Sequence, residues 1–191
     1  MLKKILLPAL ALGAMGAIVT SAQAYEVSDY VQFNIGQAKS ESVSLGPNTS
    51  SSRTSAAYKA AFGVKFNNYL ALETQYIDLG KATHKRSGHK LSMETNGIGA
   101  NFIASYPVED FSLFAKVGYH FLRSKGSYKY TSFYGAHSER DSLWRWSPSL
   151  GFGVSYAVTG NIAVTAEYEY FNDVGRVSDI EFASVGLRYH F

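Results

Sequence analysis

The sequence contains no cysteine, so a disulfide framework is excluded and the fold needs another source of cohesion. It has no large excess of charge of either sign, because 18 Lys and Arg stand against 15 Asp and Glu. That near balance gives no support to nucleic-acid binding. Beyond residue 24, no apolar run approaches the roughly 20 residues of a transmembrane helix. Any crossing of a membrane would therefore be made by strands.

The N-terminus has the three parts of a secretory signal. Two lysines come first, an apolar run extends from Ile5 to Val19, and Ala22-Gln23-Ala24 offers small residues to a signal peptidase. The apolar run is too short for a membrane-anchoring helix. We predict that residues 1–24 are a cleaved signal peptide and that residues 25–191 form one exported domain.

The rest of the chain alternates between apolar and polar residues with the period of two that is typical of strands. The alternation occupies eight segments, at residues 29–37, 55–66, 69–79, 94–106, 111–123, 144–157, 162–171 and 182–191. The connections at 67–68, 107–110 and 158–161 are tight turns, whereas those at 38–54, 80–93, 124–143 and 172–181 are long and polar. This pattern predicts an all-β fold, an eight-stranded antiparallel up-and-down transmembrane β-barrel with short periplasmic turns and longer extracellular loops.

The two faces of these segments differ in charge. One parity, with residues such as Val117, Leu150 and Val185, carries no charged residue over the spanning segments. A bilayer enforces such an absence, because Lys or Arg facing lipid near the midplane costs about 2 to 4 kcal/mol. The opposite parity holds many glycines and the charges that we predict to form a lumen network: Lys59, Lys65, Glu73, Lys116, Glu167 and Arg188. A soluble barrel or sandwich also predicts alternation, but not this sorting of glycine and charge.

The chain ends on a strand that is apolar on one side and aromatic at its terminus. Leu187, Tyr189 and Phe191 share the apolar side. This ending is typical of the closing strand of an outer-membrane barrel, and we predict that it is the signature read by the barrel-assembly machinery.

Several stretches resemble the eight-stranded outer-membrane barrels similar to the transmembrane domain of outer membrane protein A. They are YLALETQYIDLGKA at 69–82, SLFAKVGYHFLRSKG at 112–126, GFGVSYAVTGNIAVTAEYEYFNDVG at 151–175 and the closing LRYHF. The resemblance implies location in the outer membrane of a Gram-negative bacterium. It also implies a charged cluster in the lumen, with Glu73, Lys116 and Glu167 among its members. It does not identify a molecular role.

Two of the long connections have distinctive compositions. In KATHKRSGHK, the cations Lys81, Lys85, Arg86 and Lys90 occur without an acid, which suits phosphate groups of lipopolysaccharide better than a metal ion. An ordinary solvated loop explains the same residues. The connection at 124–143 mixes tyrosines with cations, which favours either adhesion or an aromatic belt anchored by Trp144 and Trp146.

From these features we expect a non-enzymatic integral barrel that contributes to envelope structure, with no cofactor and no metal. Its expected partners are outer-membrane lipid, lipopolysaccharide, the assembly machinery and a host or cell-surface ligand, but no nucleic acid. An adhesin is the first alternative, and a narrow ion channel or a lipid A-modifying enzyme are further ones. The run His137-Ser138-Glu139 has the letters of a hydrolase site but the wrong spacing, and we predict that His120 and His190 fill the lumen.

Overall fold

The computed structural model describes residues 29–40, 53–86, 89–132, 135–172, 174 and 179–191. For Arg53 and for residues 82–93 and 127–141, this description extends to the backbone alone. The predicted signal peptide at 1–24 lies outside the described residues. No helix among the described residues is long and apolar enough to cross a bilayer.

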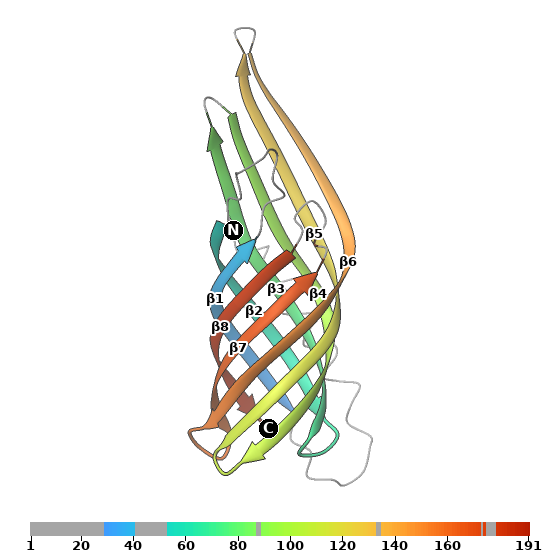
Figure 1. Ribbon diagram of the computed structural model, residues 1–191, viewed down its shortest axis with the longest axis vertical. Coiled ribbons are helices and arrows are strands. Elements are labelled where there is room, and N and C mark those ends of the chain that lie inside the picture. The colour runs from blue at the N-terminus through green and yellow to red at the C-terminus, as the bar shows by residue number, and fades with distance from the viewer. Residues whose placement is uncertain (1–28, 41–52, 87–88, 133–134, 173, 175–178) are drawn as a thin grey trace, which may run out of the picture.

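Eight antiparallel strands close into one barrel, in which each strand pairs with its sequence neighbours and β1 pairs with β8 (Figure 1). The strands are β1 (Tyr30–Ser40), β2 (Arg53–Lys65), β3 (Leu70–Arg86), β4 (His89–Val108), β5 (Phe111–Ser132), β6 (Gly135–Ala157), β7 (Ile162–Asn172) and β8 (Asp179–His190). Closure leaves no unpaired edge in the barrel wall, which is what a strand protein needs in a medium that cannot hydrogen-bond its backbone. The predicted fold class is confirmed.

Tight turns connect the strands at one end of the barrel. In the first turn, the Asn67 side-chain oxygen accepts hydrogen bonds from the backbone N–H groups of Tyr69 and Leu70, both at 2.8 Å. In the third, the Thr159 hydroxyl accepts one from the Ile162 N–H at 3.1 Å. Side-chain acceptors thus satisfy the donors that the turning backbone leaves free. This short-turn end is the periplasmic end in barrels of this architecture.

At the opposite end the strands continue farther than the sequence pattern indicates. The connections predicted at 80–93 and 124–143 are mostly extensions of β3–β4 and β5–β6, with pairing that reaches Arg86↔His89 and Ser132↔Gly135. Figure 1 shows both hairpins rising beyond the other strands, the β5–β6 hairpin farthest. The strand ends predicted from alternation were wrong here because a strand with water on both sides needs no apolar alternation, although its backbone pairs equally well.

A β-bulge marks the point where β3 leaves the barrel wall. The register shifts between Asp78 and Lys81, and Gly80 between them adopts a φ of 78°. The Asp78 carboxylate accepts a hydrogen bond from the Gly80 N–H at 2.9 Å. A Cβ at Gly80 would lie 2.2 Å from the Ala56 carbonyl oxygen, so both the dihedral angle and the space require glycine.

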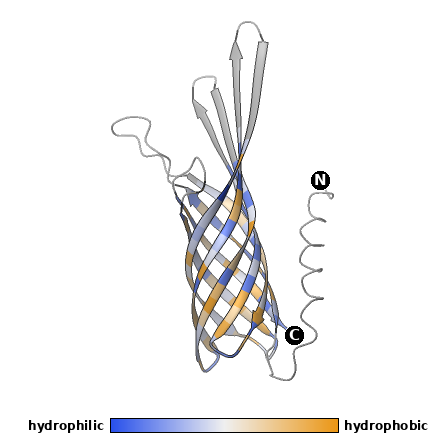
Figure 2. Cartoon of the chain, turned by 90° about the vertical axis from the view of Figure 1, so that its right-hand side faces the viewer, coloured by the Kyte–Doolittle hydropathy of each residue, from blue (hydrophilic) through white to orange (hydrophobic). Residues whose placement is uncertain are grey.

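The outward face is apolar and exposed, as the parity of the sequence predicts. Side chains of this face include Phe33, Val117 and Leu150, which are 54%, 54% and 58% exposed. In Figure 2, hydrophobic residues are spread over the barrel wall between the turns and the rim. Phe62 is an exception, since it belongs to the outward parity but is buried, with its ring centroid 6.4 Å from that of Phe191. A contiguous exposed apolar surface of this kind is stable in lipid rather than in water.

Candidate functional site

The centre of the lumen holds an ionic cluster built from three sides of the barrel. Lys59 of β2 pairs with Glu167 and Glu169 of β7. Lys116 of β5 lies 3.1 Å from Glu73 of β3, 2.7 Å from Glu167 and 3.5 Å from Glu169. All five side chains are 0–1% exposed. They meet because each occupies an inward position of its strand, and a closed barrel points these positions at one another.

Neutral donors complete the coordination of the carboxylates. The Tyr30 hydroxyl donates to Glu73 Oε2 at 2.8 Å, and the Gln75 amide donates to Glu169 Oε2 at 3.0 Å. Gln32 donates to Glu167. Buried ion pairs approach break-even only when the remaining lone pairs are satisfied in this way. The cluster is therefore a connected network across the barrel rather than a set of separate pairs.

The observed network differs from the predicted one in three members. Glu169 takes part, although the predicted network omits it. Because Glu169 is two residues from Glu167, the alternation of the strand already indicates that it faces inward. Lys65, only partly buried, makes no ion pair with any described residue. Arg188 is buried but pairs with no described carboxylate within 4.0 Å: its Nε atom donates to Gln32 Oε1 at 2.7 Å.

Buried apolar groups lie in the lumen on both sides of the ionic cluster. On the extracellular side lies a buried group of Ala38, Ala57, Ile77, Leu79, Leu122, Phe171, Val174, Ile180 and Phe182. On the short-turn side, Ala71, Ile103 and Phe114 form a second group. Next to it, the Arg188 guanidinium lies 4.3 Å from the Tyr30 ring centroid and 5.3 Å from that of Phe114. An eight-stranded barrel is narrow enough for such groups to fill it.

Glycines make room for the polar side chains, as their parity predicts. A Cβ at Gly99 would lie 2.0 Å from Cδ2 of His120, and a Cβ at Gly118 would lie 2.0 Å from the side-chain oxygen of Asn101. Asn101 in turn donates to Glu73 Oε1 at 3.3 Å. At these positions each glycine makes room for the polar side chain of its Cα partner on the neighbouring strand, and not for one from across the lumen.

The described histidines contact amide and aromatic groups. His120 is fully buried, with Nε2 2.8 Å from the Gln75 amide nitrogen and its ring 5.0 Å from that of Phe171. The His190 ring lies 5.7 Å from that of Tyr30. The side chains of His137, Ser138 and Glu139 lie outside the described residues. In the described part of the chain, no three His, Cys, Asp or Glu are grouped as metal ligands.

The other predicted site residues lie near the two ends of the barrel. Lys81 is exposed on β3, whereas the side chains of Lys85, Arg86 and Lys90 lie outside the described residues. Leu187, Tyr189 and Phe191 are all exposed on the outward face. Their exposure places these three side chains on the surface that faces lipid.

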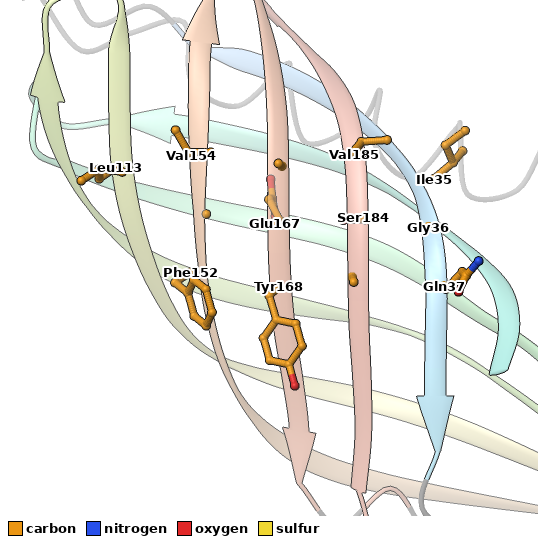
Figure 3. A pocket seen from close by; sticks show the side chains of 13 residues that line it. Ile35, Gly36, Gln37, Leu113, Phe152, Val154, Glu167, Tyr168, Ser184 and Val185 are labelled. Carbon is orange, nitrogen blue, oxygen red and sulfur yellow. The ribbon is translucent and has the colours of Figure 1, made fainter. Parts of the chain in front are cut away.

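A shallow groove of about 610 Å³ crosses the outer wall over β5, β6, β7, β8 and β1 (Figure 3). Its lining includes large outward side chains, among them Phe152, Tyr168 and Ile35, and the small Ala166 and Ala183. The groove also touches Glu167, but that carboxylate is engaged in the lumen by Lys59 and Lys116. The groove is therefore an apolar depression facing lipid and not an entrance to the ionic cluster.

Comparison with known proteins identifies this architecture. A family profile described as "OmpA-like transmembrane domain" matches residues 25–191. Outer membrane protein A of Klebsiella pneumoniae is 29% identical over 136 residues, which cover 68% of this chain and 39% of the relative. The alignment thus spans well under half of that longer protein.

Two solved barrels are similar in fold. Neisserial surface protein A has a TM-score of 0.62 at 23% identity, covering 85% of this chain and 97% of the neisserial one. Ail, the attachment invasion locus protein of Yersinia pestis, solved with the heparin analogue sucrose octasulfate, has a TM-score of 0.59 at 20% identity. That match covers 85% of this chain and 99% of Ail.

Proposed function

The chain belongs to the OmpA-like transmembrane domain family, and on that premise we propose that this outer-membrane β-barrel is a non-enzymatic structural component of the envelope. In this proposal the barrel has a structural role in the membrane and its lumen is closed to solutes. Its extracellular β3–β4 hairpin, with Lys81, Lys85, Arg86 and Lys90, contacts lipopolysaccharide. Its closing strand, with Leu187, Tyr189 and Phe191, is read by the assembly machinery.

The filled lumen is the observation that carries this proposal. Paired charges occupy the centre, and apolar groups lie above and below them. Diffusion of a solute through such an interior would require both apolar groups and the ion pairs to rearrange. The described lumen histidines contact amides and rings, which favours a packing role over catalysis.

A deletion strain tests the envelope role. We expect the strain to take up the hydrophobic dye N-phenylnaphthylamine faster than its parent, and the wild-type gene to restore the barrier. A deletion strain with unchanged dye uptake and detergent resistance would refute the envelope role. Conductance measured in planar bilayers provides a separate check, because a barrel with a closed lumen should carry no ion current.

The hairpin contact with lipopolysaccharide has its own test. Lys81 and Glu94 are Cα partners, so replacing residues 82–93 with a two-residue Asn-Gly turn shortens β3–β4 without shifting the register. The shortened protein loses Lys85, Arg86 and Lys90, and we expect it to retain less lipopolysaccharide on purification from membranes. Equal retention would remove this part of the proposal.

Adhesion is a second candidate, and the projecting β5–β6 hairpin favours it (Figure 1). Ail, a barrel of similar fold, was solved with a sulfated heparin analogue. Gly126 and Asp141 are Cα partners, so an Asn-Gly turn in place of residues 127–140 removes this hairpin in register. Loss of heparin or cell binding in this variant, but not in the β3–β4 variant, would support adhesion; unchanged binding would exclude this hairpin as the adhesive surface.

A further inference from the structure

The only two tryptophans of the chain lie together on the outward side of the barrel. Trp144 and Trp146 of β6 are 48% and 63% exposed, and their Cα partners on β5 are Arg123 and Phe121. The Phe121 ring stacks on Trp144 at 4.7 Å and also lies 5.0 Å from Trp146. Tyr119 extends the group, 6.2 Å from Trp146. We call these four rings the β5–β6 aromatic patch.

A guanidinium lies directly next to this patch. Arg123 is placed over Trp144, with Cζ 5.3 Å from the ring centroid. Among the described residues, its buried Nε atom has no hydrogen-bond partner, and no carboxylate lies within 4.0 Å of the guanidinium. Two other outward cations differ in this respect, since Lys39 lies 3.9 Å from Glu181 and Lys125 lies 4.0 Å from Glu94.

The height of Arg123 in the barrel places it at the membrane surface. A tilted strand crosses the hydrocarbon in about nine to eleven residues. Counted from Phe111 at the short-turn end of β5, Arg123 comes just after that span. Tyrosine and tryptophan collect at this level because their rings are apolar and their polar atoms reach water. The outer leaflet displays phosphorylated glycolipid there, so a guanidinium with no carboxylate partner among the described residues faces anionic headgroups.

We propose that Arg123 binds a phosphate monoester of an outer-leaflet glycolipid whose acyl chain lies along the β5–β6 aromatic patch. The planar guanidinium donates two parallel hydrogen bonds to a phosphate, and stacking on Trp144 holds it in a fixed orientation. The rings supply an apolar contact for the chain below the phosphate. This inference rests on the proposed residence in the lipopolysaccharide leaflet, but it concerns a different surface from the β3–β4 hairpin.

Tryptophan emission tests the site in the native protein, because both fluorophores belong to the patch. The full barrel in detergent micelles is titrated with lipid A that carries its phosphates, with lipid A stripped of phosphate, and with phosphatidylglycerol. We expect a saturable shift in emission with phosphorylated lipid A and at least tenfold weaker binding of the other two lipids. Equal binding of phosphate-free lipid A would overturn the phosphate contact, and equal binding of phosphatidylglycerol would overturn the glycolipid assignment.

Variants separate the site from a general aromatic belt. Arg123→Gln should weaken lipid A binding at least tenfold. Arg123→Lys should recover part of the binding, because an ammonium keeps the positive charge but cannot donate the two parallel hydrogen bonds of a guanidinium. Lys39→Gln, on the β1–β8 wall, is the matched control and should bind like wild type. Native mass spectrometry counts retained lipid independently of emission, and heat-modifiable migration on a denaturing gel verifies that each barrel is folded.

The outcomes also separate this site from the envelope role. If Arg123→Gln bound lipid A with wild-type affinity, the proposed site would be wrong, and the expected phenotype of the deletion strain would not be affected. A deletion strain with a normal barrier would overturn the envelope role, while lipid A binding by the purified barrel would still support the site.

Discussion

The inner and outer surfaces of the same eight strands accommodate charge in opposite ways. Lys116 and Val117 are neighbours in β5, yet the Lys116 ammonium is buried among Glu73, Glu167 and Glu169, whereas Val117 is 54% exposed on the lipid side. Both environments have a low dielectric constant, so an isolated charge is expensive in either. The lumen can supply partners from across the barrel, and hydrocarbon cannot. Charge is therefore paired inside and absent outside.

The largest expected loss of stability comes from removing one partner of the ion pairs in the lumen. Lys116→Met removes the ammonium that contacts Glu73, Glu167 and Glu169, and it leaves Glu73 without an ion pair among the described residues. Removing one partner of a buried pair leaves uncompensated charge and costs about 3 to 5 kcal/mol. Urea unfolding in lipid vesicles, followed by tryptophan emission, measures the loss in the free energy of unfolding. If Lys116→Met were no more destabilising than Lys39→Met in the rim pair with Glu181, the network would have no structural importance.

A slightly smaller loss is expected when charge is placed on the outer face. Val117→Lys puts an ammonium into hydrocarbon one residue away from a position where lysine is native. The cost near the midplane is about 2 to 4 kcal/mol, measured by the same unfolding assay. Val117→Ala is the control for lost side-chain volume. A Val117→Lys barrel as stable as this control would contradict the assignment of the outward face to lipid.

Space in the lumen should matter less than charge. Gly99→Ala would bring a Cβ to 2.0 Å from His120, so the imidazole must move. Overpacking of this kind costs about 1 to 3 kcal/mol. Gly126→Ala is the matched control, since nothing lies within 4 Å of its added Cβ. Equal unfolding free energies for these two variants would show that the lumen is looser than the described contacts indicate.

The smallest effect is expected at the rim. Lys39 and Glu181 are 3.9 Å apart, with side chains 48% and 32% exposed. Water and salt screen such a pair, so Lys39→Ala should change the free energy of unfolding by less than about 1 kcal/mol. A double-mutant cycle with Glu181→Ala gives the coupling energy. If this coupling energy were close to that of the ion pairs inside the lumen, buried and rim pairs would not differ in the way described above.

Much of the barrel follows from local pattern, and the exceptions have physical causes. Period-two alternation predicts all eight strands, and parity predicts that Glu73, Lys116 and Glu167 face inward. The length of the β5–β6 hairpin escapes prediction because backbone pairing above the membrane leaves no apolar signature. The stacking of Arg188 between Tyr30 and Phe114 escapes it as well, since those residues lie on three different strands.

The order of residues along the chain determined which face of each strand meets lipid, because side chains of an extended strand alternate strictly and a charge in hydrocarbon is excluded. It also determined the eight-strand count and the end at which the tight turns lie. Closure of the barrel decided which lysine meets which glutamate. Lys59 and Glu169 are far apart in sequence, and their contact depends on the register and tilt of strands that only the closed wall brings to face one another.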